Sequence, residues 1–252
     1  MKGKNVVTNI LIYQMGKVGS AAIRDSLNAI GIINYQVHYL DHKKLENLTN
    51  RHEKLGMKIP PHILRSKEVL SGNVLNNRGV KIISLMRDPV ARNVSAFFQN
   101  LETYFPQTPL SELDSALLID TFITKYSHRI SVDWFKNEFL PVTKIDVCAN
   151  SVNKTNGCYT FNHENIDVLL IKVEANDEEK VKALKEFLDL PDTFTLLKIN
   201  IGDEKSYSEK YKEFKSKIKL PKSYLDEMYD SKLICHFYDD DSIAKMRSKW
   251  EG

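Results

Sequence analysis

One segment near the N-terminus, residues 9–30 (NILIYQMGKVGSAAIRDSLNAI), constrains the fold more than any other part of the chain. Its first six residues are mostly apolar, which predicts a buried strand over residues 9–14. Apolar residues then recur every three to four positions, which predicts a helix over residues 20–30. Residues 15–19 form a loop between the two, with two glycines. A strand, a glycine-containing loop and a helix in this order are typical of an α/β fold that binds a phosphate-like anion.

Later apolar runs predict further buried strands at residues 35–40, 80–86 and 167–173. Helical patterns alternate with these runs, and the second half of the chain is mostly helical. The sequence therefore predicts a P-loop-like, three-layer α/β/α fold around a central parallel sheet. No boundary stands out, and 252 residues suit one sizeable domain, so we expect a single domain over residues 1–252.

The loop has the chemistry of an anion site. Glycines let the backbone approach an anion closely, and the N–H groups at a helix N-terminus stabilise negative charge. Small residues follow the loop and keep those N–H groups accessible, and a lysine adds a mobile positive charge. The plain alternative is a glycine-containing turn that binds nothing. The candidate anion-binding residues are Gly16, Lys17, Val18, Gly19, Ser20, Ala21 and Ala22.

The loop departs from the ATP-binding pattern. A Walker loop requires G-x-x-x-x-G-K-[ST], with the lysine directly before the hydroxyl residue. Here Lys17 stands three residues before Ser20. The usual lysine position and the usual magnesium-binding hydroxyl of such loops are therefore missing.

A second pattern, LMRDPVARNVSAFF, follows the third predicted strand. Asp88 and Pro89 predict the start of a helix, as N-cap and first helical residue. Arg87 ends the strand and Ser95 lies on the helix, and an arginine with a hydroxyl can bind a phosphate. In the alternative, Arg87 merely pairs with Asp88. Because the carboxyl ends of parallel strands meet at one sheet edge, Arg87 and the loop suggest a ligand with two anionic groups.

The segments QMGKVGSAA and RDPVARNVSAFF together resemble the two signatures of sulfotransferases that use 3′-phosphoadenosine 5′-phosphosulfate (PAPS). The first resembles their 5′-phosphosulfate loop, and the second their 3′-phosphate motif. Ala21 departs from related loops, which often carry Ser or Thr, but it keeps its N–H. The chain is also similar to a bacterial sulfotransferase-like group of capsular polysaccharide synthesis proteins, through VHYL (37–40), WFKNEF (134–139), IDV (145–147) and HFYDDDSI (236–243).

This resemblance implies transfer of a sulfuryl group from PAPS to a hydroxyl of a carbohydrate or glycoconjugate in capsular or exopolysaccharide biosynthesis. The product would be adenosine 3′,5′-bisphosphate (PAP). The loop would hold the 5′-phosphosulfate, with Lys17 at the bridging oxygen, while Arg87 and Ser95 would bind the 3′-phosphate. The sulfuryl group carries less negative charge than a terminal phosphoryl group, so we expect no metal.

The acceptor hydroxyl also needs a base. His38 is the first candidate, because it lies near the carboxyl end of the second predicted strand and close to the loop. Related carbohydrate sulfotransferases use a histidine or a glutamate for this step. His42, His62 and Glu68 are alternatives, and His38 could instead be a core histidine. Trp134, Phe135 and Tyr104 could stack on a sugar ring, although their helical patterns favour packing.

The composition of the chain argues against several classes of protein. A net charge of +3 is too small to indicate a nucleic-acid binder, and three cysteines without C-x-x-C spacing give no zinc or disulfide pattern. No run approaches the roughly 20 apolar residues of a membrane span, and with no export signal we expect cytoplasmic action. An ATP-dependent kinase and a non-catalytic nucleotide-binding relative remain alternatives. The acceptor and the oligomeric state stay open.

Overall fold

The structure, a computed structural model, describes residues 10–54, 56, 58–72, 74–76, 79–198 and 206–252. Asn9, the first residue of the first predicted strand, lies outside them. The chain divides into two compact units. Unit 1 comprises Met1–Arg87, Trp134–Asn150 and Asn156–Leu197, and unit 2 comprises Asp88–Asp133, Ser151–Thr155 and Lys198–Gly252. The single domain predicted over residues 1–252 stays a prediction.

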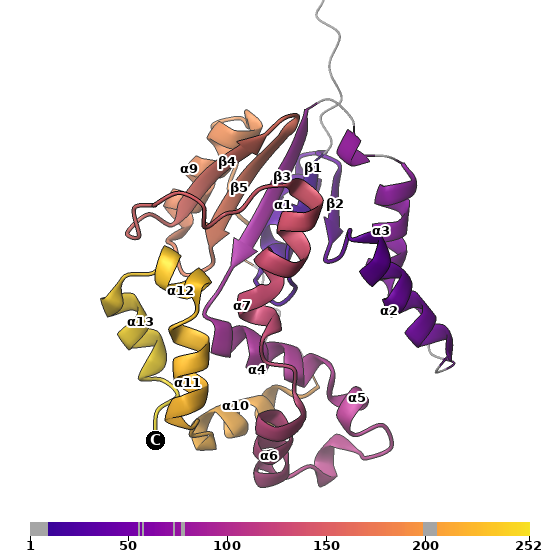
Figure 1. Cartoon of the computed structure of the whole chain (residues 1–252), viewed down its shortest axis with the longest axis vertical. Helices are drawn as coiled ribbons and strands as arrows, with labels where there is room; N and C mark the ends of the chain where they lie inside the picture. Colours follow the sequence, from indigo (N-terminus) through magenta and orange to yellow (C-terminus); the bar gives the residue numbers. More distant parts are fainter. Residues whose placement is uncertain (1–9, 55, 57, 73, 77–78, 199–205) are drawn as a thin grey trace, which may run out of the picture. The chain divides into compact units, whose positions relative to one another are not determined.

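Unit 1 is built on a five-stranded sheet with the order β2-β1-β3-β5-β4 (Figure 1). Its strands are β1 (Ile10–Tyr13), β2 (Asn34–Val37), β3 (Val80–Met86), β4 (Cys158–His163) and β5 (Ile166–Lys172). The first three strands and β5 pair in parallel, as predicted. The edge strand β4 departs from the predicted parallel arrangement, because it pairs antiparallel with β5. Only two residues join these strands, and so short a connection permits only an antiparallel hairpin.

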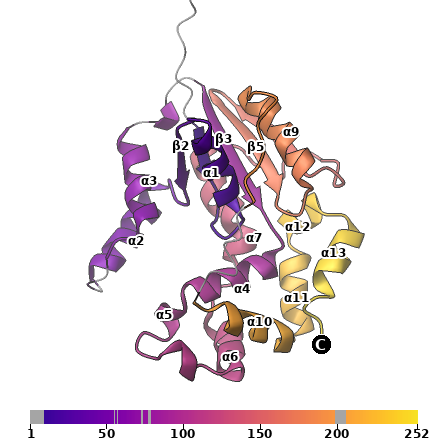
Figure 2. The same ribbon diagram turned by 180° about the vertical axis from the view of Figure 1, so that it is seen from behind.

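Helices lie on both faces of this sheet, as the three-layer prediction requires. Figure 2 shows α1 and α9 in front of the sheet, whereas the helical stretch that continues from α7 covers the opposite face in Figure 1. The helices of unit 1 are α1 (Ser20–Ala29), α2 (His42–Lys54), α3 (Pro61–Ser71), the 3₁₀ turn η1 (Val74–Asn76), the π-helical turn η3 (Phe135–Phe139), α8 (Leu140–Thr143) and α9 (Asp177–Leu188).

The apolar residues of β1 form the centre of the core of the sheet. Leu11, Ile12 and Tyr13 are fully buried, because β1 lies between β2 and β3 with helices over both faces. The second strand is shorter than predicted. It ends at Val37, which pairs with Tyr13, so the chain leaves the sheet one residue before His38. The carboxyl ends of β1 and β2 thus meet where the loop begins.

Unit 2 is helical and packs around aromatic side chains. Its helices are α4 (Pro89–Gln99), α5 (Leu101–Tyr104), the 3₁₀ turn η2 (Leu110–Glu112), α6 (Ser115–Lys125), α7 (Ile130–Trp134, whose last residue belongs to unit 1), α10 (Ser208–Lys217), α11 (Lys222–Tyr229), α12 (Lys232–Phe237) and α13 (Asp240–Arg247). The rings of Phe97, Phe122 and Phe214 lie 5.4 to 6.1 Å apart and are buried. Within the described residues, no helix combines the length and the hydrophobicity that crossing a bilayer demands.

The predicted start of α4 is confirmed. Asp88 is the N-cap, and its Oδ1 accepts hydrogen bonds from the N–H groups of Val90 and Ala91 at 3.0 and 3.1 Å. Pro89 occupies the first helical position, where its missing N–H costs nothing. The same Asp88 oxygen also accepts a hydrogen bond from the Tyr229 hydroxyl at 3.0 Å, which ties α11 to the start of α4.

Candidate functional site

The loop between β1 and α1 has an unusual backbone. Gly16, Lys17 and Gly19 have φ angles of 79°, 64° and 70°. Glycine adopts this left-handed region freely, whereas Lys17 does so at a cost of roughly 1–2 kcal/mol. The guanidinium of Arg87, directly after β3, donates a hydrogen bond from Nη1 to the Lys17 carbonyl at 3.1 Å. Arg87 therefore helps to hold the strained residue in place.

The start of α1 presents hydrogen-bond donors. Gly19 is the N-cap of this helix, and no side chain caps the first turn. The first N–H groups of an α-helix have no partner within the helix, so those of Ser20, Ala21 and Ala22 point out of its end. The positive end of the helix dipole lies at the same place. The first turn of α1 is therefore suited to an anion.

The Ser20 hydroxyl adds a further donor, because its neighbours leave it able only to donate a hydrogen bond to a ligand. Its oxygen accepts from the side-chain amides of Gln14 and Gln36 at 2.9 and 2.8 Å. The Gln14 amide cannot be reversed, because its oxygen accepts from the backbone N–H of Gly16. The Gln36 amide is fixed likewise, since its oxygen accepts from Arg24 at 3.0 Å. With both lone pairs of the hydroxyl in use, Ser20 has only its proton to offer a ligand.

His38 lies beside this loop. Its Nδ1 is 2.8 Å from the carbonyl oxygen of Gln14. Because a carbonyl only accepts hydrogen bonds, Nδ1 carries the proton, and in the neutral ring Nε2 carries the lone pair. A Cβ added to Gly16 would stand 3.5 Å from that Nε2. The proton-accepting nitrogen of His38 therefore borders the anion loop, which is the placement that a general base requires.

The other candidate bases lie on the helices that follow β2. His62 is half-buried on α3, and its ring centroid is 5.1 Å from that of His38. Burial, and to a lesser extent the charge of His52, lowers the pKa of His62. His42 is exposed at the start of α2, and Glu68 is exposed on α3. Of the four candidates, His38 is the one that the described contacts place against the loop.

The second predicted anion motif is divided between the two units. Arg87 is half-buried in unit 1, and Ser95 is half-buried on α4 in unit 2. Their joint binding of a phosphate therefore stays a prediction. Asp88, the neighbour of Arg87 in the sequence, caps α4 and accepts a hydrogen bond from the Tyr229 hydroxyl.

Sequence reasoning missed several residues that build this site. Gln14 and Gln36 order the Ser20 hydroxyl, and no motif marks them. Glu138 was also missed, although it is a charged residue within the apolar stripe of WFKNEF, which is a recognisable signal. Trp134 and Phe135 are buried core residues, which agrees with the packing alternative. Tyr104 is half-buried and packs against Phe97 with ring centroids 5.3 Å apart.

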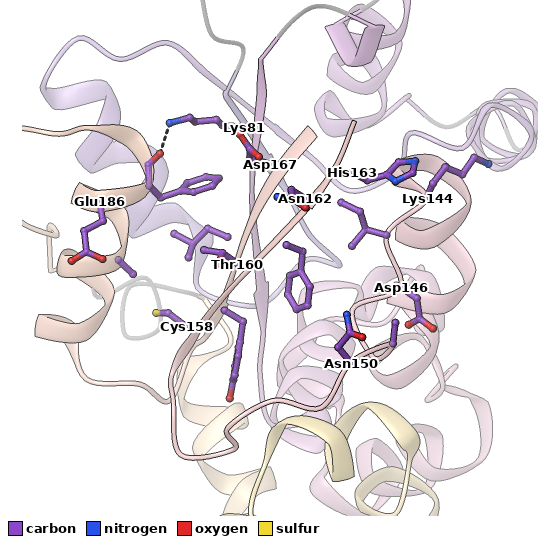
Figure 3. Close-up of a pocket in the computed structure, with 17 residues that line it drawn as sticks. Lys81, Lys144, Asp146, Asn150, Cys158, Thr160, Asn162, His163, Asp167 and Glu186 are labelled. Carbon is purple, nitrogen blue, oxygen red and sulfur yellow. Dashed lines mark hydrogen bonds between the residues drawn. The ribbon is translucent and has the colours of Figure 1, made fainter. Parts of the chain in front are cut away.

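A pocket of about 780 Å³ lies elsewhere in unit 1, along the edge strand β4 (Figure 3). Lys81 and Glu186 lie on one side of that strand and Lys144 and Asn150 on the other. The pocket reaches Lys81, near the amino end of β3, whereas ligands of parallel sheets bind at the carboxyl ends. Burial raises the pKa of the Cys158 thiol in this pocket to about 11, so that thiol stays protonated. We therefore place the candidate site at the loop.

No group of three or more His, Cys, Asp or Glu side chains within the described part of the chain is arranged to bind a metal ion. A protein-family model, NKWYS, described as "Putative capsular polysaccharide synthesis protein", matches residues 111–239, which is just over half of the chain. The match includes Trp134 and Glu138, while the loop, His38 and Arg87 lie before it. Comparisons with curated proteins and with solved structures give no match.

Proposed function

We propose that this chain, which belongs to the NKWYS family, is a sulfotransferase that moves a sulfuryl group from PAPS to a hydroxyl of a glycan or glycoconjugate. One observation carries the proposal: the Nε2 edge of the His38 ring borders Gly16, in a loop that leads into the hydrogen-bond donors of the first turn of α1. A base beside an anion site is the arrangement needed to transfer an anionic group to a hydroxyl. The family description supports a carbohydrate acceptor.

The donor set fits a phosphosulfate. The first-turn N–H groups, the Ser20 proton and the Lys17 ammonium all donate hydrogen bonds, and the oxygens of phosphate and sulfate esters accept them. PAPS supplies a sulfuryl group joined to its 5′-phosphate through a bridging oxygen. A guanidinium carries five N–H donors, so the bond from Arg87 to the Lys17 carbonyl is compatible with a further bond to the 3′-phosphate.

The chain's own groups can assist the transfer at three points. His38 Nε2 takes the proton of the acceptor hydroxyl as the acceptor oxygen bonds to sulfur and the bond from sulfur to the bridging oxygen breaks. The Gln14 carbonyl, already bound to Nδ1–H, stabilises the positive charge that the ring gains. The Lys17 ammonium stabilises the negative charge that develops on the leaving phosphate oxygen. The proton ends on His38, and PAP is released.

Labelled donors test this reaction directly. The purified chain is incubated with ³⁵S-labelled PAPS, or with ATP labelled in its γ-phosphate, and with a panel of neutral, amino-sugar and uronic-acid oligosaccharides. We expect ³⁵S in an oligosaccharide product and no transfer of phosphate. Transfer of phosphate from ATP would contradict the proposal in favour of a kinase. Binding of PAP without transfer to any acceptor, including small alcohols, lipids and tyrosine peptides, would favour a non-catalytic relative.

A further inference from the structure

We infer that Glu138, together with Trp134, is a positioning residue that holds His38 against the loop. The catalytic meaning of this inference rests on the proposed function, but the placement itself does not. Glu138 lies on η3, on the sheet face opposite α1, and has no contact with the loop among the bonds described for it.

The need for such a residue arises where the sheet ends. The parallel pairing of β1 with β2 finishes at Tyr13 and Val37, followed by one hydrogen bond from the Gln14 N–H to the Val37 carbonyl at 3.2 Å. His38 follows immediately, outside the strand ladder. Its backbone must therefore be ordered by groups other than the neighbouring strand.

Glu138 and Trp134 supply these groups from one helical stretch. The Trp134 indole donates from Nε1 to the His38 carbonyl at 3.1 Å. The Glu138 Oε1 accepts from the backbone N–H of Leu40 at 2.7 Å and from that of Asp41 at 3.0 Å. The segment that carries His38 is thus held at its start and at its end, in place of the missing strand pairing.

Further donors surround the Glu138 carboxylate, which is only 1% exposed. The Tyr13 hydroxyl donates to Oε1 at 2.7 Å, and the Lys44 ammonium lies 3.0 Å from Oε2. Burial, and then the charge of Glu138, raises the pKa of Tyr13 well above its usual range, so the hydroxyl remains a donor. A buried carboxylate is costly unless donors surround it, and an apolar side chain would fill the same space more cheaply. Directional hydrogen bonds to residues 40 and 41 account for a carboxylate here.

The helix is widened at this point. Residues Phe135–Phe139 form a π-helical turn, and the Leu140 N–H bonds the Phe135 carbonyl. Such turns are rare and occur frequently at functional sites. The turn lies between Trp134 and Leu140, so the carboxylate that binds residues 40 and 41 comes from the irregular part of the helix.

The Glu138→Met variant of the full chain tests the inference, because methionine has a similar length but no oxygen to accept the bonds from residues 40 and 41. Long-range ¹H–¹⁵N NMR identifies which ring nitrogen of His38 carries the proton. We expect the Nδ1–H form in the wild type, and a shift toward a mixture of tautomers in the variant. The affinity of the variant for PAP should stay within about twofold of the wild-type affinity, because the loop keeps its own contacts. The kcat for sulfuryl transfer should fall at least about tenfold with little change in KM for PAPS.

Matched variants separate positioning from general packing. Asn137→Ala alters an exposed side chain on the same π turn and should leave all three readouts unchanged. Lys44→Met removes the ion pair at Oε2 but not the bonds at Oε1, so its effect should be small. Trp134→Phe keeps a ring and removes the N–H bound to the His38 carbonyl, which gives an independent test if Glu138→Met does not fold. Glu138→Asp should restore part of the kcat.

Two results would overturn the inference. One is a folded Glu138→Met protein in which the His38 signals are those of the wild type. The other is a loss of PAP affinity as large as the loss of kcat, which would indicate a general packing role. If the wild type transfers no sulfuryl group to any acceptor, the proposed function fails, while the NMR comparison still decides whether Glu138 positions His38.

Discussion

The carbonyl oxygen of Gln14 accepts a hydrogen bond from Nδ1 of His38 at 2.8 Å, which joins the first residue after β1 to the first residue after β2. In the neutral ring, this bond selects the tautomer in which Nε2 carries the lone pair. The side chain of the same Gln14 binds both the Gly16 N–H and the Ser20 hydroxyl. One residue therefore connects the candidate base to the candidate anion site.

Replacing His38 should separate chemistry from binding. His38→Gln removes the proton acceptor but keeps a polar side chain, so kcat should fall by about 10²–10⁴ because general-base assistance is lost. PAP affinity, measured by calorimetry, should remain near that of the wild type. His163→Gln on β4, an exposed histidine, is the control and should leave kcat unchanged. An unaltered kcat in His38→Gln would remove His38 from the reaction and bring His62 forward.

Two glycines with similar backbone angles isolate the role of Gly16. Gly16→Ala and Gly31→Ala each place a Cβ at a left-handed φ, of 79° and 77°, and each should cost about 1–2 kcal/mol of stability. The Cβ at position 16 would stand 3.5 Å from the His38 Nε2, whereas the Cβ at position 31 meets nothing within 4 Å. Activity should therefore fall in Gly16→Ala alone. If Gly16→Ala and Gly31→Ala had equal activities and equal unfolding midpoints in urea, the contact between position 16 and His38 would have no role in activity.

The Ser20 network predicts a combined effect on stability and binding. Ser20→Ala leaves the side-chain N–H groups of Gln14 and Gln36 without their common acceptor, at a cost of roughly 1–3 kcal/mol. The loss of the hydroxyl donor should also weaken PAP binding by about tenfold. Urea unfolding and calorimetry measure the two effects. Ser71→Ala, at the exposed end of α3, should change neither, and unchanged PAP affinity in Ser20→Ala would exclude its hydroxyl from the anion site.

The half-buried His62 predicts how the stability of the folded chain depends on pH. Burial lowers its pKa in the folded chain below the ordinary value of 6.5. As the pH falls through about 6.5, His62 of the unfolded chain binds a proton before His62 of the folded chain does. The stability that depends on a neutral His62 is therefore fully present above pH 6.5 and is lost as the pH falls toward the pKa of the folded chain. His128 acts in the same direction in unit 2. The loss of stability between about pH 7.5 and pH 5.5 should be smaller in His62→Gln than in the wild type or in His163→Gln. Equal losses would show that His62 does not titrate as its burial implies.

The sequence predicts the sheet better than the site. Apolar runs mark β1, β3 and β5, and the Asp88–Pro89 pair marks the start of α4, because local patterns determine these elements. The end of β2 is mispredicted, because Tyr39 and Leu40 continue the strand-like pattern of YQVHYL beyond Val37. Beyond Val37, Trp134 and Glu138 replace the strand partner. Residues 158–163 (CYTFNH) do not form an apolar run, so the antiparallel edge strand β4 is not among the strands predicted from the sequence.

The site itself depends on contacts between residues that are distant in the sequence. The glycines and Lys17 can be recognised from the loop motif, and His38 from its place at the end of a strand. The hydrogen bond from Gln36 to Ser20 joins residues 16 positions apart, and that from Leu40 to Glu138 joins residues 98 apart. No local pattern encodes such pairs, so the tautomer of His38 and the donor role of Ser20 could be assigned only from the structure.

Calorimetric titration of the purified chain with PAP, with ATP as the comparison and no magnesium added, is the measurement that shows whether the loop binds a phosphosulfate donor. We expect that PAP binds, that ATP binds weakly, and that PAP binding is lost in Lys17→Ala and in Arg87→Ala. Lys182→Ala, which alters an exposed lysine on α9, should bind PAP as the wild type does. A folded protein that gives no heat with PAP, or that prefers ATP, would contradict the assignment of the loop to a phosphosulfate donor.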